Sequence, residues 1–92
     1  MLEFEWNEEK NRLNIVKHGW DFARAAQVFR DPFGVVEEDR TLAYGEARFR
    51  ITGVVDSRMI TVIYTERVGA LRLISARKAT SHERKNYESF VR

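Results

Sequence analysis

The amino-acid sequence predicts an α+β fold, in which a short strand and two helices precede a twisted antiparallel sheet and a C-terminal helix. Three observations predict it. Helix start and stop signals fall within residues 7–31, three runs rich in β-branched residues occupy residues 48–77, and a capping box begins at Thr80. Because a sheet and an amphipathic helix each have one apolar face, we expect the N-terminal helices to pack on the sheet.

Length and composition indicate a single domain over residues 1–92. The chain has no cysteine, which excludes disulfides and thiolate metal sites, and no internal repeat or linker divides it. It has no apolar run of about 18 residues and no signal peptide, so we expect a cytoplasmic protein without a membrane span. Residues 1–46 hold 6 basic and 10 acidic side chains, whereas residues 47–92 hold 10 basic and 4 acidic ones. This asymmetry favours an anionic partner such as nucleic acid, although an uneven scatter of surface charges would look the same.

The first strand is predicted from the alternation of its side chains, and the two helices after it are predicted from the residues that begin and end them. Residues 2–6 alternate apolar and acidic side chains and predict a short strand. Asn7 can cap a helix whose last turn carries cations that suit the helix dipole and which closes at Gly19. Asp21 can cap a second short helix, which ends before Pro32 because proline cannot extend a helix.

The remaining chain is predicted to be mostly sheet. A strand is expected to start at residues 34–36, and an exposed loop follows over residues 37–46. Three strands of an antiparallel meander, separated by breaks of hairpin size, are expected at residues 48–55, 59–67 and 70–77. Thr80 and Glu83 have the spacing of a capping box, so a last helix should run to about residue 91. The side chains it is expected to bury are Tyr87, Phe90 and Val91.

Hairpin loops with an even number of residues would sort the strand side chains onto two faces. We assume that Asp56 faces Met59 and that Arg67 faces Ala70. One face then collects the expected core residues Phe49, Ile51, Val55, Ile60, Val62, Tyr64, Leu71 and Leu73. The other face collects Arg48, Arg50, Thr52, Thr65, Arg67 and Arg72, with Arg48 opposite Arg67 and with Arg50, Thr65 and Arg72 in one row.

Four arginines on one face indicate a surface for phosphate groups. Like charges across a ladder oppose folding, whereas a phosphate backbone would neutralise arginines and accept bidentate hydrogen bonds from them. The alternative is that Glu46, Glu66 or the acidic stretch at residues 37–39 pairs with these arginines. A slip of one residue in either loop would also disperse the cluster.

Most catalytic templates are absent from the sequence. His18 and His82, without cysteine or a close acidic set, do not make a metal site, and there is no Gly-rich phosphate loop or serine nucleophile motif. The basic residues together with Glu66 and Tyr64 suit metal-free phosphodiester chemistry, in which cations stabilise the charged transition state and a tuned Glu, His or Tyr moves protons. Structural roles compete with this interpretation, since His18 could be a helix-end cation and Tyr64 a core residue. Glu66, at a strand end, could orient Arg77 or act as a base.

Seven short motifs follow one another in a specific order and spacing. They are Phe4-Glu5-Trp6-Asn7-Glu8-Glu9-Lys10, which is followed by Asn14, then Lys17-His18-Gly19, Asp21-Phe22-Ala23, Phe29-Arg30-Asp31-Pro32, Tyr44-Gly45-Glu46-Ala47-Arg48, Val62-Ile63-Tyr64-Thr65-Glu66-Arg67 and Ile74-Ser75-Ala76-Arg77-Lys78-Ala79-Thr80. From residue 4 to about residue 87, the pattern resembles the BrnT family of type II toxins. The resemblance implies a small RelE-like fold and a ribonuclease that inhibits growth by cutting RNA.

The same resemblance implies partners. A BrnA-type antitoxin with a ribbon-helix-helix DNA-binding part would neutralise the toxin, and the complex would repress its own operon, so that operator DNA is contacted only through the antitoxin. We therefore expect a toxin–antitoxin hetero-oligomer and an RNA substrate, with no metal or cofactor and no membrane partner. The antitoxin is expected to cover the arginine face. The alternative function is a non-catalytic nucleic-acid-binding or adaptor module.

Ten residues make up the candidate site. The catalytic candidates are Arg48, Glu66, Arg67, Arg77 and His18. The RNA-binding candidates are Lys10, Lys17, Arg50, Arg72 and Lys78. In the expected reaction, the ribose 2′-hydroxyl attacks the adjacent phosphate while Arg48, Arg67 and Arg77 hold that phosphate, and Glu66 or His18 is the general base.

Overall fold

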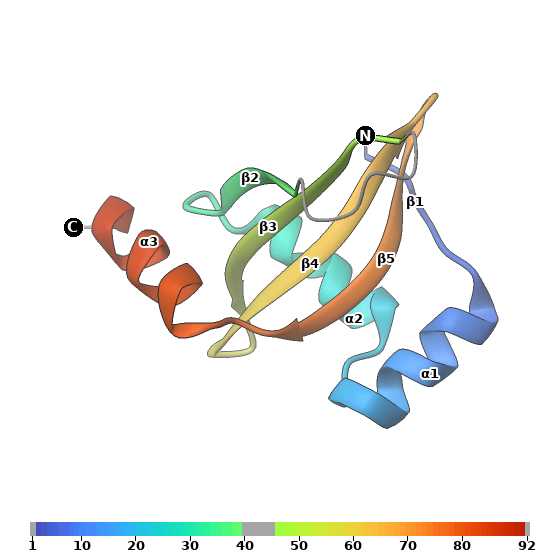
Figure 1. The fold of residues 1–92 in the computed structure, drawn as a ribbon, viewed down its shortest axis with the longest axis horizontal. Coiled ribbons are helices and arrows are strands. Elements are labelled where there is room, and N and C mark those ends of the chain that lie inside the picture. The colour runs from blue at the N-terminus through green and yellow to red at the C-terminus, as the bar shows by residue number, and fades with distance from the viewer. Residues whose placement is uncertain (1, 40–45, 92) are drawn as a thin grey trace.

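A computed structural model of the chain describes residues 2–39 and 46–91, and it confirms the α+β class (Figure 1). In chain order the elements are β1 (Phe4–Glu5), α1 (Glu8–His18), α2 (Phe22–Ala25), the 3-10 helix η1 (Ala26–Arg30), β2 (Val35–Asp39), β3 (Arg48–Val55), β4 (Arg58–Arg67), β5 (Ala70–Lys78) and α3 (Ser81–Val91). The predicted caps are present, because the Asn7 side chain accepts a hydrogen bond from the Lys10 amide and that of Asp21 accepts one from the Ala23 amide. Gly19 closes α1 with a φ of 77°, which glycine adopts without strain.

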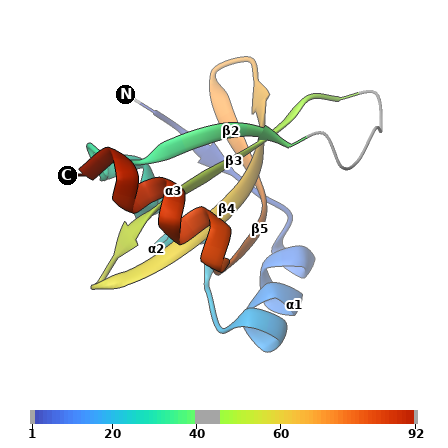
Figure 2. The same ribbon diagram turned by 60° about the vertical axis from the view of Figure 1, so that its left-hand side comes forward.

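The strands form one five-stranded sheet in the order β1-β5-β4-β3-β2. Strand β1 runs parallel to β5, and all other neighbours are antiparallel. Helix α2 lies behind the sheet in Figure 1, and α3 lies on the other side, in front of β3, in Figure 2. Helix α1 packs beside β5. The face that carries α3, called the polar face below, presents Arg48, Arg50, Thr52, Thr61, Thr65, Arg67, Arg72 and Arg77.

The core lies between the opposite face of the sheet and the N-terminal helices, as predicted. The strands bury Ile51, Val55, Ile60, Val62, Tyr64 and Leu73, and Phe49 and Leu71 pack against them partly buried. Phe22 and Val28, from α2 and η1, are fully buried against this face. Val62 and Leu73 therefore point into the core while the arginines point away from it, which confirms the expected sorting of the two faces.

The predicted register of the first hairpin is wrong by two residues. The turn consists of Asp56 and Ser57, with φ values of 51° and 65°, so Val55 rather than Asp56 begins the pairing, opposite Arg58. Two-residue turns with positive φ at both positions match the twist of the strands, and Asp tolerates that conformation better than most residues. An even shift keeps every side chain on its predicted face but changes its partner.

The shift breaks up the predicted row of arginines. Arg50 lies opposite Ile63 rather than Thr65, and Phe49 lies opposite Tyr64, so Arg48 is not opposite Arg67. The second hairpin agrees with the prediction, because Arg67 faces Ala70 and Thr65 faces Arg72. A β-bulge between Ile63 and Tyr64 changes the register farther along β4 and β5.

Three further expectations are corrected by the structure. Residues 37–39 belong to β2 rather than to an exposed loop, because the Glu37 and Asp39 side chains meet Arg50 across the polar face; residues 40–45 lie outside the described part of the chain. The second helix tightens to a 3-10 helix after Ala25. Helix α3 buries Tyr87 as expected, but Phe90 is 67% exposed because the helix extends beyond the sheet. Val91 is also exposed.

Candidate functional site

The arginines of the polar face are paired with acidic side chains. Arg67 pairs with Glu46 at 3.2 Å, and Arg72 pairs with Glu5 at 2.8 Å. Arg50 is surrounded by three carboxylates, those of Glu37 at 3.7 Å, Asp39 at 4.0 Å and Glu83 at 3.8 Å. The alternative expectation, that Glu46 and the acidic stretch at residues 37–39 pair with arginines, is thus confirmed. Like-charge repulsion across this face is therefore no argument for a phosphate ligand, and phosphate binding by these arginines stays a prediction.

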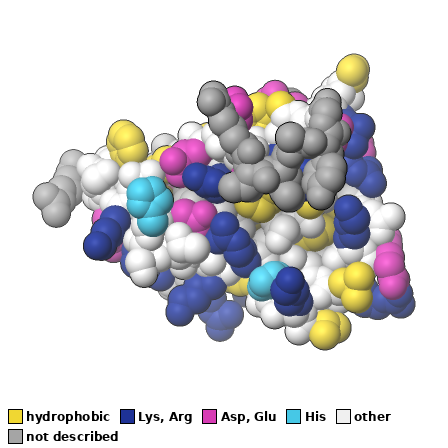
Figure 3. All heavy atoms as spheres, in the orientation of Figure 1, with side chains coloured by type: hydrophobic (Ala, Val, Ile, Leu, Met, Phe, Trp, Pro, Cys, Tyr) yellow, Lys and Arg dark blue, Asp and Glu magenta, His cyan; other side chains and the backbone are white. Residues whose placement is uncertain are grey.

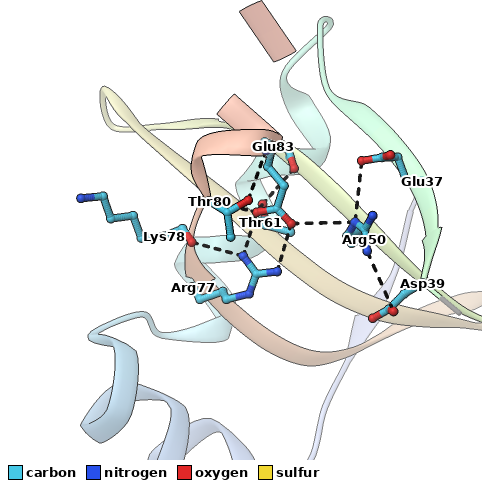
Figure 4. A network of polar contacts seen from close by, with 9 residues as sticks. Glu37, Asp39, Arg50, Thr61, Arg77, Lys78, Thr80 and Glu83 are labelled. Atoms are coloured by element: carbon cyan, nitrogen blue, oxygen red, sulfur yellow. Dashed lines mark hydrogen bonds and ion pairs between the residues drawn. The ribbon is translucent and has the colours of Figure 1, made fainter. Parts of the chain in front are cut away.

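Glu83 is the centre of a polar network that holds α3 on the polar face (Figure 4). Its side chain is almost fully buried and accepts hydrogen bonds from Arg77 Nη1 and Nη2 at 2.8 and 3.0 Å and from the Thr61 hydroxyl at 2.8 Å. The Thr80 amide donates to Glu83 at 2.8 Å and the Thr80 hydroxyl accepts from the Glu83 amide, which confirms the predicted capping box. Burial alone would raise the pKa of Glu83, but these hydrogen bonds and the Arg77 charge lower it to about 2.

Glu83 rather than Glu66 is therefore the carboxylate that orients Arg77. Along β4, Glu66 lies opposite Leu71 near one end of the strand, whereas Arg77 lies opposite Thr61 near the other end. The two catalytic candidates Glu66 and Arg77 are consequently not brought together by the sheet. Because both terminal nitrogens of Arg77 donate to Glu83, only the remaining donors of its guanidinium are available to another ligand.

Four basic side chains from four different elements meet around one cavity of about 460 Å³. They are His18 at the end of α1, Arg58 at the start of β4, Lys78 at the end of β5 and Arg84 in α3. Trp20, Ser57, Met59 and Ile60 form the rest of its lining. In Figure 3, lysine and arginine side chains gather around one of the two histidines in the lower part of the molecule. We call this site the cationic cavity.

In the described part of the chain, the charges of the cationic cavity have no acidic side chains to balance them. Among the described residues that line it, none is Asp or Glu, and none of the described carboxylates forms an ion pair with Arg58, Lys78 or Arg84. Asp56, in the turn beside Arg58, pairs with Arg24 instead. An anion entering this cavity would therefore meet uncompensated cations, in contrast to the paired arginines of the polar face.

His18 is half-buried at the edge of the cationic cavity. Burial, and after it the positive charges of Lys17 and Arg77, lower the pKa of His18 below its ordinary value of 6.5. The imidazole is consequently mostly neutral at pH 7, and a neutral imidazole can accept a proton. The competing interpretation of His18 as a helix-end cation fits this environment less well.

The remaining candidates are spread over the molecule. Lys17 is exposed beside His18, while Lys10 is exposed in the first turn of α1. Tyr64 is a core residue that packs on Phe29 and Phe49, and burial raises its pKa. The candidates at the opposite end of the sheet from the cationic cavity are Arg48, Glu66, Arg67 and Arg72.

Sequence reasoning did not single out Arg58 or Arg84. Arg58 directly follows the first hairpin turn, and Arg84 follows the capping-box glutamate. The sequence therefore indicates where each arginine lies in its own strand or helix. Their convergence with His18 depends on how α1 packs against β5 and how α3 packs against β3, which no local pattern encodes. Within residues 2–39 and 46–91, no group of three or more His, Asp or Glu side chains could hold a metal ion. No helix of the same ranges is long and apolar enough to cross a membrane.

Comparison with known proteins places the chain in a family. The model of the family described as "Ribonuclease toxin, BrnT, of type II toxin-antitoxin system" matches residues 6–83, which include most of the sheet, both N-terminal helices and the first turn of α3. No curated protein matches the sequence significantly. The match spans three of the four basic residues of the cationic cavity as well as Glu83. The chain therefore belongs to the BrnT family of ribonuclease toxins of type II toxin–antitoxin systems.

Proposed function

We propose that this toxin cleaves RNA in the cationic cavity without a metal ion. One observation supports this proposal most directly. The cations of this cavity lack acidic partners among the described residues, whereas the arginines of the polar face have acidic partners. Arg58, Lys78 and Arg84 would neutralise the scissile phosphate and the charge that develops on it in the transition state. Such preorganised donors are each worth on the order of 10²-fold to 10³-fold in rate.

His18 is the proposed general base. It takes the proton of the ribose 2′-hydroxyl as the 2′-oxygen bonds to phosphorus, and the bond from phosphorus to the 5′-oxygen breaks. The leaving 5′-oxygen takes a proton from solvent, so the products are a 2′,3′-cyclic phosphate and a 5′-hydroxyl. The lowered pKa of His18 supports this role, because only the neutral imidazole accepts a proton.

The arginines of the polar face are proposed to contact flanking phosphates of the same RNA. Arg67 and Arg72 retain 44% and 34% exposure of their side chains beside their acidic partners, so they remain accessible to a polyanion. Arg77 is also proposed to act on His18, because its positive charge lowers the pKa of the imidazole. Arg48, Arg50 and Glu66 stay candidates for binding or proton transfer on the basis of their positions in the family's motifs. Lys10 and Lys17 would extend the basic path along α1.

Cleavage of labelled RNA by the purified toxin, analysed on denaturing gels, tests the proposal. His18→Ala and Arg58→Ala should each lower the cleavage rate by on the order of 10²-fold. Arg12→Ala is the matched control, since Arg12 is exposed on α1, pairs with Glu9 and lies away from the cavity. Full activity in the His18 and Arg58 variants, or loss of wild-type activity on adding EDTA, would contradict the proposal. A shifted RNA band without cleavage products would instead favour a non-catalytic RNA-binding module.

We further propose that a BrnA-type antitoxin with a ribbon-helix-helix part neutralises this toxin in a hetero-oligomer that represses its own operon. Membership of a type II toxin family supports a cognate antitoxin. The antitoxin would cover the polar face and the cationic cavity with acidic side chains. Arg72→Glu should weaken co-purification of the complex and make it more sensitive to salt, whereas Arg12→Glu should not. In a gel-shift assay the complex, and not the toxin alone, should bind operator DNA.

A further inference from the structure

Helix α1 is attached to the rest of the molecule by polar rather than apolar side chains. Asn11 and Asn14 are its buried residues, while Leu13 is 59% exposed and Val16 is 83% exposed. A surface helix ordinarily buries its apolar residues, because their burial supplies most of its tertiary stabilisation. The inverted arrangement of α1 indicates that its two asparagines make specific contacts that fix its position.

Asn14 connects three segments of the chain. Its Nδ2 donates to the carbonyl oxygen of Trp20 at 2.8 Å and to that of Ala76 at 2.9 Å, and its Oδ1 accepts from the Ala76 amide at 3.1 Å. The two bonds to Ala76 repeat the pattern by which two residues of neighbouring antiparallel strands pair. Strand β1 pairs with β5 only at Leu71 and Arg72. Beyond the end of β1, the Asn14 side chain provides the hydrogen-bond partners for the backbone amide and carbonyl of Ala76 at the edge of β5.

These hydrogen bonds lie next to the cationic cavity. Ala76 directly precedes Arg77 and Lys78 in β5, and Asn14 lies one helical turn before His18 on the same side of α1. We propose that Asn14 is a positioning residue, which locks the end of α1 to β5 and thereby holds His18 against the cations of the cavity. The catalytic meaning of this role rests on the proposed function, but the contact between α1 and β5 does not.

The surroundings of His18 provide a measurable consequence. The cations that face or adjoin it are Lys17 on its own helix, Arg77 and Lys78 on β5, Arg58 on β4 and Arg84 on α3. Among the described residues that line the cavity, none is acidic. If α1 loses its link to β5, His18 becomes more hydrated and moves away from Arg77, and both changes favour the protonated imidazole.

The test is a proton NMR titration of the two histidines in the full chain. Asn14→Ala should raise the pKa of His18 toward 6.5, and the exposed His82 serves as an internal reference signal. Asn11→Ala is the matched control. Asn11 is equally buried in α1, but its amide donates to Asp21 and accepts from the Phe22 amide, so its loss leaves the bonds to β5 intact. The same samples allow hydrogen exchange of the Ala76 amide to be followed, which should accelerate in Asn14→Ala and not in Asn11→Ala.

An equal rise of the His18 pKa in both variants, or no rise in Asn14→Ala, would overturn the proposal. Should Asn14→Ala fail to fold, Asn14→Gln and Asn11→Gln are compared in the same way, because glutamine keeps the amide and displaces it by one methylene. RNA cleavage by Asn14→Ala should fall by on the order of 10²-fold, with its pH profile shifted upward together with the His18 pKa. A shifted pKa with unchanged cleavage would refute His18 as the base while leaving the positioning role of Asn14 standing.

Discussion

Replacing Glu83 by Gln tests how the polar face holds α3. The pKa of Glu83 falls from 4.5 to about 2 in the folded chain, because its hydrogen bonds to Arg77, Thr80 and Thr61 outweigh the effect of burial. One pKa unit corresponds to about 1.4 kcal/mol, so the ionised carboxylate stabilises the fold by about 3 kcal/mol at pH 7. Because the folded-state pKa is depressed, this contribution is present above pH 4.5 and is lost as the pH falls toward 2.

Urea denaturation of the wild type and Glu83→Gln at pH 7 and at pH 3 measures this contribution. The difference in free energy of unfolding should be about 3 kcal/mol at pH 7 and should shrink by about 2 kcal/mol at pH 3. Glu88→Gln, at an exposed position of the same helix, is the control and should stay within about 0.5 kcal/mol of the wild type. A difference of the same size at both pH values would refute the reasoning, since it would mean that the shape of Glu83 matters and its charge does not.

Three other substitutions have defined outcomes. Tyr87→Phe removes the 2.7 Å hydrogen bond to Asp31 and should lower the free energy of unfolding, measured by urea denaturation, by about 1.5–3 kcal/mol. Because burial and Asp31 raise the pKa of Tyr87 to about 12, the wild type should lose more stability than the variant as the pH rises from 10 toward 12. Gly53→Ala would place a Cβ 2.9 Å from Val28 Cγ2 and should cost about 1–3 kcal/mol, and an unchanged melting temperature would mean that β3 yields at this contact. Arg67→Ala removes an exposed pair and should change stability by less than about 1 kcal/mol while slowing RNA cleavage; unaltered cleavage would remove Arg67 from the candidate site.

The elements and the two faces of the sheet could be predicted from the sequence because each rests on a local signal. Asn7, Asp21 and Thr80 cap their helices as their positions in the chain indicate. Strand periodicity placed Val62 in the core and Arg50 on the opposite face. The register of the first hairpin was not predictable in the same way, because shifting the turn by one residue leaves the pattern of faces intact while it moves every cross-strand partner by two positions.

The candidate site was predicted only in part, because charge balance depends on tertiary structure. Periodicity correctly grouped arginines on one face, but it did not predict their acidic partners. These partners stand on other elements, Glu5 on β1 beside Arg72 and Glu83 on α3 beside Arg77. Conversely, nothing local marks Arg58 as different from the other arginines. The role proposed for it rests on the absence of an acidic partner among the described residues, which becomes apparent only when all elements are in place.

Strand β2 closes one side of the sheet, and three of its five residues are acidic. The outer edge of such a strand offers backbone amides and carbonyls to any other extended chain, so two copies of this molecule could in principle join their sheets edge to edge. Two β2 strands approaching each other would bring six carboxylates together, two from each of the positions 37, 38 and 39. The acidic composition of β2 therefore discourages self-association of the toxin, most effectively at low ionic strength, where these charges are least screened.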